Sequence, residues 1–286
     1  MTDLYANRQT LENTQYLHLS AALLVTIGRW WCDVPKEDLK ELKKLAADMK
    51  PKAGVNAMTD GNRKMLRHFD DRALARRLLD MAADIQRTFR RRSGFTLKEA
   101  RLIQRATMVE LQLCAPLRTR NLACLEIGPN VFERGGKFYV HIPAEDVKNY
   151  VPLDFELDDH CAKILRFYIA KVRPLLFEGN NTFLWPGSDG KHLNVNYVGS
   201  LLGSFMEDEV GVRVTAHRFR HVAGYLYLLD NPNGFEVVRL MLGHRSIKTT
   251  MSFYASLELK EAQKRYDAAR ARRRRELFPT KGSRHD

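Results

Sequence analysis

The stretch MLGHRSIKTTMSFYAS occupies residues 241–256 and carries the most informative spacing in the chain. His244 follows a Leu-Gly pair, and Tyr254 lies ten residues later, beyond a segment rich in basic and hydroxyl side chains. Taken alone, the stretch predicts a helix that begins after Gly243, with Tyr254 as an ordinary half-buried aromatic residue. Only the rest of the chain can favour a chemical role.

The composition limits what kind of protein this is. A chain of 286 residues has room for one large domain or two modest ones, and a hydrophobic fraction of 44% indicates a folded protein. The formal net charge of +13 indicates a polyanionic partner, such as nucleic acid or an anionic membrane.

The cysteines and the apolar segments argue against two other classes. Cys32, Cys114, Cys124 and Cys161 form no Cys-x-x-Cys pair and have no histidine at ligand spacing, which predicts reduced thiols in the cytoplasm and no zinc site. The longest apolar run, residues 19–31, is too short and too interrupted to span a bilayer. We predict a buried helix there.

The fold class follows from periodicity and capping signals. The sequence predicts a mainly α protein with one small antiparallel sheet (α+β), in which a hairpin at 131–142 turns at Gly135-Gly136 and a third strand at 150–155 pairs with it. Helices are predicted at 35–50, 70–92, 96–113, 158–172, 195–208, 216–229 and 234–242. The predicted parts are a helical N-terminal region at 1–92, a second domain at 93–261 and a basic tail at 262–286.

Several basic side chains in the second half have two interpretations. Arg118, with Arg120 close by, sits in a proline-containing break between apolar helices, where it can cap a helix or bind an anion. His217, Arg220 and His221 are spaced to share one helix face, which is either solvated or a phosphate site. Lys148, near the hairpin, is an ordinary loop lysine when considered alone.

The order of these groups resembles the catalytic domain of the tyrosine recombinases, the phage integrase family, over about residues 95–260. APLRTRNL is similar to the family's first arginine box, HRFRH to its His-x-x-Arg box, and LGHRSIKTT followed by FYA to its histidine and nucleophile segment. The resemblance implies a catalytic set of Arg118, Lys148, His217, Arg220, His244 and Tyr254.

The resemblance also implies the chemistry. Arg118 and Arg220 would hold the nonbridging oxygens of a DNA phosphate, with a further hydrogen bond from His244. Tyr254 would attack the phosphorus, and because a phenol has a pKa near 10, a base is needed, for which His217 is the candidate. Lys148 would protonate the leaving 5′-oxygen. The product is a 3′-phosphotyrosyl intermediate. The resemblance implies that the reaction needs no metal ion, no ATP and no other cofactor.

The sequence departs from the family pattern in the nucleophile segment and at the N-terminus. Many members place the tyrosine nine residues after the histidine, where this chain has Phe253. Tyr254 is the only phenol in that segment, so it is the predicted nucleophile. Residues 1–92 stand where the family keeps a core-binding domain, and we expect a divergent or truncated version of it.

These features predict a site-specific DNA recombinase of a mobile element, cytoplasmic and associated with the nucleoid. Its expected partners are double-stranded DNA, further copies of itself in a tetramer on paired sites, and candidate DNA-bending proteins, with no membrane. A type IB topoisomerase-like strand transferase and a non-catalytic DNA-binding relative remain alternatives. The tail has nine Lys/Arg against three Asp/Glu, which is typical of a solvated or disordered end. Two functional interpretations compete with that one. Arg270 to Arg275 indicate phosphate contact. An apolar stripe indicates instead a helix at about 257–277 that is exchanged between subunits, the functional interpretation that we prefer, and it comprises Leu257, Leu259, Ala262, Tyr266 and Ala269.

Overall fold

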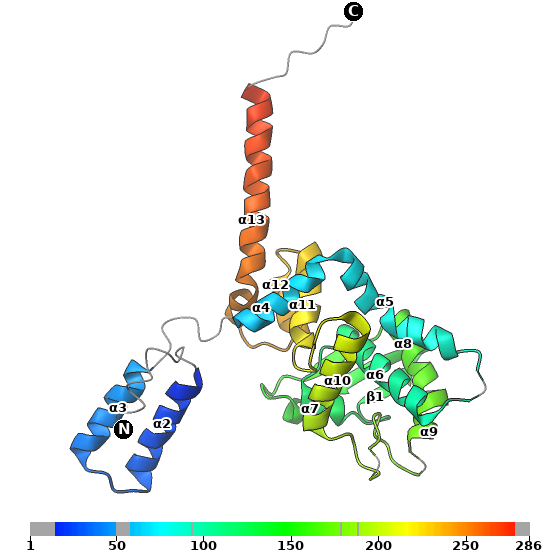
Figure 1. The fold of residues 1–286 in the computed structure, drawn as a ribbon, viewed down its shortest axis with the longest axis horizontal. Helices are drawn as coiled ribbons and strands as arrows, with labels where there is room; N and C mark the ends of the chain where they lie inside the picture. The colour runs from blue at the N-terminus through cyan, green and yellow to red at the C-terminus, as the bar shows by residue number, and fades with distance from the viewer. Residues whose placement is uncertain (1–14, 50–57, 93, 178, 188, 278–286) are drawn as a thin grey trace, which may run out of the picture. The chain divides into compact units, whose positions relative to one another are not determined.

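The computed structural model describes two compact units, Met1–Ala57 and Met58–Asp286. The described residues are 15–49, 58–92, 94–177, 179–187 and 189–277, with only the backbone described at 15, 16, 255–261 and 264. Figure 1 shows the elements of both units, which are treated separately below.

The first unit is a helical pair, α2 (Gln15–Trp30) and α3 (Lys36–Asp48). Its buried residues are small or flexible, with Ala21, Ala46 and Met49 at the contact. The prediction of a buried helix at 19–31 is wrong in one respect. The segment is helical, but Leu23 is 59% exposed and Trp30 is 67% exposed, because α3 covers only a narrow face of α2 among the described residues.

The second unit begins with α4 (Asp60–Arg67), the short turn η2 (His68–Asp70) and α5 (Arg72–Phe89). These helices pack on elements that follow residue 93, and the hydroxyl of Tyr225 donates a 2.6 Å hydrogen bond to Asp70. The division between compact units therefore falls after Ala57, and α4 and α5 belong to the second unit. The domain boundary expected at residue 92 is a separate matter from this compactness and stays a prediction.

The central helix of the second unit is α6 (Leu97–Cys114). The capping box predicted from Thr-x-x-Glu is present, since the Thr96 side chain accepts from the Glu99 backbone and the Glu99 carboxylate accepts from the Thr96 backbone. Ile103, Met108 and Leu111 are fully buried. Such complete burial is expected for a helix contacted by α5, α8, α9, α10 and α11, all of which pack against it.

The sheet has three antiparallel strands in the order β1-β2-β3. They are β1 (Val131–Arg134), β2 (Lys137–Ile142) and β3 (Leu153–Glu156). The turn between the first two uses Gly135 and Gly136, both at positive φ, a conformation that glycine adopts without steric cost. In the middle strand Val140 pairs with Val131 on one side and Phe155 on the other, which confirms the predicted pairing of the third strand with the hairpin.

The remaining elements are mostly helical, and the predicted α+β class is confirmed. They are α7 (Thr119–Ala123), η3 (Ala144–Asp146), α8 (Asp159–Phe167), η4 (Tyr168–Val172), α9 (Arg173–Leu176), α10 (Val195–Val210), α11 (Phe219–Asp230), α12 (Phe235–Met241) and α13 (Ile247–Leu277). Among the described residues, no helix is both long and apolar enough to cross a membrane.

The last helix, α13, joins two predicted regions, because it carries Tyr254 near its start and continues without a break to Leu277. Ala262, Tyr266 and Ala269 of the predicted stripe are exposed. Leu257 and Leu259 belong to the helix, but their side chains lie outside the described residues, as does everything after Leu277.

Candidate functional site

Arg118 is the N-cap residue of α7 and follows the buried residues 115–117, which connect it to the end of α6. Its side chain is half-buried, and its Nη1 is buried with no hydrogen-bond partner among the described residues. Burial lowers the pKa of this guanidinium, but it stays charged at neutral pH. A buried donor left without an acceptor costs free energy, so this atom favours an incoming anion.

Arg220 lies in the first turn of α11 and is 5% exposed. Its Nη1 donates to the carbonyl oxygen of Pro116 at 2.5 Å, and its Nη2 donates to the carbonyl oxygen of Leu242. These bonds join the Arg118 segment to the end of α12, so the guanidinium is held in a fixed position. Burial, together with the charge of Arg118, lowers the pKa of Arg220 to about 10, which indicates that the two arginines are close.

His217 differs from the sequence prediction, because it lies in the turn before α11 and not on a helix face shared with Arg220. Its ring lies edge-on to that of His221, with ring centroids 5.8 Å apart. The pKa of His217 is lowered by desolvation, and further by the charges of Arg220 and Arg118. A neutral imidazole beside two guanidiniums is able to accept a proton at neutral pH.

His244 follows the glycine that ends α12. Gly243 has φ +60°, and a Cβ built there would lie 2.9 Å from the Leu153 side chain, so the Leu-Gly-His sequence requires a glycine. The Nδ1 of His244 lies 2.9 Å from the hydroxyl of Thr250 in α13. Burial, with the charges of Arg220 and Arg118, lowers the pKa of His244 to about 4, so the ring is neutral at pH 7.

Lys148 lies in the turn between η3 and β3 and is exposed. No hydrogen bond or ion pair joins its side chain to another described residue. Its neighbour Asn149 donates from Nδ2 to the carbonyl oxygen of Gly243 at 2.9 Å, and the Asn149 carbonyl accepts from Arg245. The turn that carries Lys148 is therefore tied to the His244 segment, although the lysine itself does not contact the other predicted residues.

Tyr254 and Phe253 occupy different environments. Tyr254 is 1% exposed, and its hydroxyl donates a 3.4 Å hydrogen bond to the carbonyl oxygen of His221. Burial raises the pKa of this phenol, an effect opposed by the charge of Arg220. The ring of Phe253 lies 5.2 Å from that of His221 and 6.4 Å from that of His244. Phe253, and not Tyr254, therefore faces the histidine cluster in this conformation.

The six predicted residues are thus only partly assembled. The charges of Arg118 and Arg220 lower the pKa values of His217 and His244, whereas Lys148 stays outside this group and the Tyr254 hydroxyl is covered. Sequence reasoning missed Gly224 of α11, which leaves room for the phenol: a Cβ there would lie 2.4 Å from the Tyr254 hydroxyl. A lone glycine inside a predicted helix was the one available signal.

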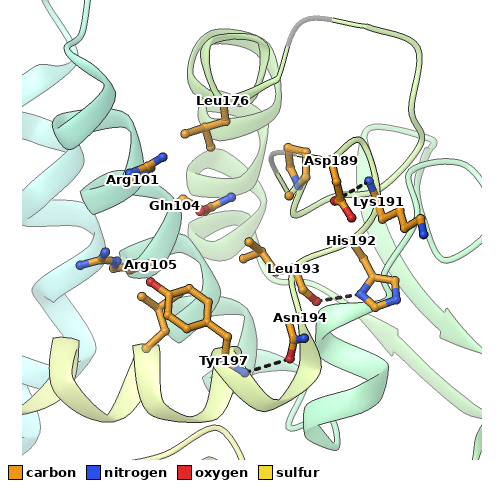
Figure 2. Close-up of a pocket in the computed structure, with 13 residues that line it drawn as sticks. Arg101, Gln104, Arg105, Leu176, Asp189, Lys191, His192, Leu193, Asn194 and Tyr197 are labelled. Atoms are coloured by element: carbon orange, nitrogen blue, oxygen red, sulfur yellow. Dashed lines mark hydrogen bonds between the residues drawn. The ribbon is translucent and has the colours of Figure 1, made fainter.

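A separate hollow of about 540 Å³ opens between α6, α10 and the segment around 186–194. Figure 2 shows Arg101, Gln104 and Arg105 along its α6 wall and Tyr197 on α10. The opposite wall contains Asp189 and Lys191. None of the six predicted catalytic residues lines it, so the candidate site is the arginine and histidine cluster at the other end of α6.

Comparison with known proteins agrees with the sequence resemblance. The family model described as the phage integrase family matches residues 94–261. The structure of the XerH site-specific recombinase bound to palindromic difH substrate, a post-cleavage complex, aligns at 17% identity with a TM-score of 0.51, covering 69% of this chain and 52% of that one. The XerA recombinase aligns at 15% identity with a TM-score of 0.48, covering 87% of this chain and 82% of that one. The chain spans about half the length of the XerH chain, and no curated protein matches by sequence. Because the family model covers more than half of its residues, the chain belongs to the phage integrase family.

Proposed function

We propose that this protein is a site-specific DNA recombinase that cleaves and rejoins double-stranded DNA through a phosphotyrosyl intermediate, with Tyr254 as nucleophile. The observation that carries the proposal is the buried, unsatisfied Nη1 of Arg118 beside the fixed guanidinium of Arg220. Two permanent cations in a partly desolvated site suit the extra negative charge that a phosphodiester gains in its transition state.

The proposed reaction balances without a metal ion or a nucleotide. The Tyr254 oxygen bonds to phosphorus while the bond from phosphorus to the 5′-oxygen breaks, which leaves a 3′-phosphotyrosine and a free 5′-hydroxyl. His217 takes the phenol proton, because its lowered pKa keeps the ring neutral. Lys148 gives a proton to the leaving oxygen, and His244 donates a hydrogen bond to the phosphate. Attack by a second 5′-hydroxyl reverses these steps and joins new strands.

Cleavage in this scheme requires a local rearrangement. The Tyr254 hydroxyl is bonded to the His221 carbonyl and packed on Gly224, so it has to leave α11 before it reaches a phosphate. The turn that carries Lys148 also has to bring the lysine towards the cluster. We propose that DNA binding, and assembly of a tetramer on paired sites, supply these movements, and that the recombinase serves a mobile element.

One observation favours a second function, that of a non-catalytic DNA-binding relative. Phe253 occupies the position nine residues after His244 and faces the histidines, where a phenylalanine has no hydroxyl for attack. In that case the arginine cluster would bind a phosphate without cleaving the strand.

Covalent trapping distinguishes the two functions. The purified chain is mixed with a pool of nicked duplexes of randomised sequence, and denaturing gels are used to detect protein that migrates with DNA. We expect a covalent adduct, and peptide mapping of that adduct should locate the DNA on Tyr254. Retention of DNA on native gels without any adduct across the pool would support the non-catalytic relative instead.

A further inference from the structure

Two helices of the second unit bring together side chains that the proposed reaction does not use. Glu110 and Cys114 are four residues apart on α6, and Cys161 lies in the first turn of α8. Their ligand atoms, one carboxylate oxygen and two sulfurs, all lie within 4.8 Å of one another. The Nε2 of His160 lies 3.9 Å from the Glu110 carboxylate.

The Glu110 side chain is the unusual member of this cluster, since it is only 6% exposed. Burying a carboxylate is costly unless a cation or several donors satisfy it. The Cys114 thiol donates to it at 3.6 Å, and none of the described arginines or lysines forms an ion pair with it. The cluster therefore contains a buried acceptor group without a strong positive partner among the described residues.

We propose that Glu110, Cys114, Cys161 and His160 form a binding site for a zinc ion. Two sulfurs, a carboxylate and an imidazole are the donor types that zinc takes in proteins, usually four in a tetrahedron. Bond lengths of roughly 2.0–2.3 Å place such ligand atoms about 3.3–3.8 Å apart, so the carboxylate and the two sulfurs, which lie within 4.8 Å of one another, need only a small inward movement. His160 lies outside this group of three and reaches Glu110 alone, so its ring has to turn towards the sulfurs to become the fourth ligand. His160 is 52% exposed, which leaves a route for the ion from solvent.

The negative charges of the ligands exceed the charge of a bound zinc ion by only one. On binding, each thiol releases its proton to solvent and its sulfur donates an electron pair to the metal, while the imidazole binds as a neutral ligand. Two thiolates and one carboxylate against a divalent cation leave one net negative charge. Cys161 lies at the N-terminal end of α8, where the helix dipole and free backbone N–H groups favour negative charge.

A disulfide between the two cysteines explains less of the structure. It would use two of the four groups and leave the buried carboxylate as poorly satisfied as before. A metal ion engages all four and links the C-terminal end of α6 to the start of α8. Because Cys114 is the last residue of α6 and Arg118 caps the next helix, the ion would stabilise the segment that carries the first arginine. The inference does not depend on the proposed recombinase function.

Metal analysis of the full chain tests the inference directly. Protein is loaded with zinc, freed of excess by dialysis and assayed for bound metal; we expect about one equivalent in the wild type and almost none in Cys114→Ser or Cys161→Ser. Cobalt(II) should give sulfur-to-metal charge-transfer absorption in the wild type that these variants lose. Cys124→Ser and Cys32→Ser are matched controls, because these thiols lie outside the cluster, and should behave as the wild type.

A surface variant keeps the test valid if the core variants fail to fold. His160→Ala changes an exposed side chain, so the fold should tolerate it. The loss of a residue that only supports a metal ligand weakens metal affinity by about tenfold or more, and the loss of a ligand itself should weaken zinc affinity further. Zinc should also raise the unfolding midpoint of the wild type by several degrees. Wild-type protein that binds no zinc or cobalt, or that forms a Cys114–Cys161 disulfide in its place, would overturn the proposal.

Discussion

The hydroxyl of Tyr254 donates a 3.4 Å hydrogen bond to the backbone carbonyl oxygen of His221, so the predicted nucleophile is covered by α11, the helix that follows the predicted base His217. The neighbouring side chain, Phe253, faces the rings of His221 and His244. Any phosphoryl transfer by Tyr254 therefore begins with a change at the start of α13, and the first predictions concern this region.

Replacing the phenol should separate binding from cleavage. We expect Tyr254→Phe to bind DNA as the wild type does and to form no covalent adduct with nicked duplexes. The free energy of unfolding should change by at most about 1 kcal/mol, because the lost hydrogen bond is long. Tyr266→Phe is the control, since that phenol is 62% exposed on the same helix. Adduct that persists in Tyr254→Phe and disappears in Tyr266→Phe would reverse the assignment.

Gly224 should prove to be the residue that admits the buried phenol. In Gly224→Ala the new Cβ would meet the Tyr254 hydroxyl at 2.4 Å, and such overpacking costs roughly 1–3 kcal/mol. Gly199→Ala is the matched control, because Gly199 also lies within a helix but has open space around it, and it should gain roughly 0.5–1 kcal/mol. Denaturant titration measures both. Equal stability of the two variants would show that Tyr254 does not pack against Gly224.

Lys148 and Arg118 should respond differently to a substrate with sulfur at the 5′-bridging position, whose thiolate leaves without a proton. On ordinary DNA, Lys148→Ala should slow adduct formation by about 10²–10⁴-fold, and the sulfur substrate should restore most of that loss. Arg118→Ala should lose roughly 10²–10³-fold on either substrate, because the phosphate charge stays unmatched. Failure of both variants on the sulfur substrate would refute the role of Lys148 as general acid.

The histidine cluster should make the fold sensitive to acid. Burial and neighbouring positive charge lower the pKa of His221 to about 4 from an ordinary 6.5. The unfolded chain therefore binds more protons than the folded one between these values, so this contribution is present above pH 6.5 and is lost as the pH falls towards 4. We expect His221→Gln to lose less stability than the wild type over that interval in thermal melts. The exposed His68→Gln should follow the wild type, and an unchanged slope in His221→Gln would contradict the prediction.

The C-terminal part of α13 allows a test between DNA contact and subunit exchange. Replacing Arg272 to Arg275 with glutamine should flatten the salt dependence of DNA binding by about 0.9 log units per lost contact if these arginines bind phosphates. If the helix is exchanged, Tyr266→Glu should prevent assembly on paired sites and leave the affinity for a single site unchanged. We expect the second result, because Ala262, Tyr266 and Ala269 are exposed along one helix and recur at helical spacing. A weaker salt dependence of DNA binding in the arginine variant, together with normal assembly of the Tyr266→Glu variant on paired sites, would favour phosphate contact.

Local sequence patterns were sufficient for most of the architecture. The Gly135-Gly136 turn, the Thr96 capping box and the third strand at 153–156 were all predictable, because they depend on residues close together in the chain. The order of the arginine, histidine and tyrosine boxes likewise indicated the phage integrase family, which the family model confirms. The exposure of α2 was not predictable, since burial depends on which helix packs against it.

The orientation of the candidate site was decided by tertiary packing. One step along a helix turns the side chain by about 100°, so whether Phe253 or Tyr254 faces the histidines depends on how α13 lies against α11 and α12. The cluster of Glu110, Cys114 and Cys161 could not be predicted from cysteine spacing, because its donors come from two helices that are far apart in the sequence. All three strands lie between α6 and α8 in chain order. Arg220 likewise finds its partners, the carbonyl oxygens of Pro116 and Leu242, only where three distant segments meet. Sequence patterns report local conformation, whereas these contacts depend on the burial of faces that come together only in the folded chain.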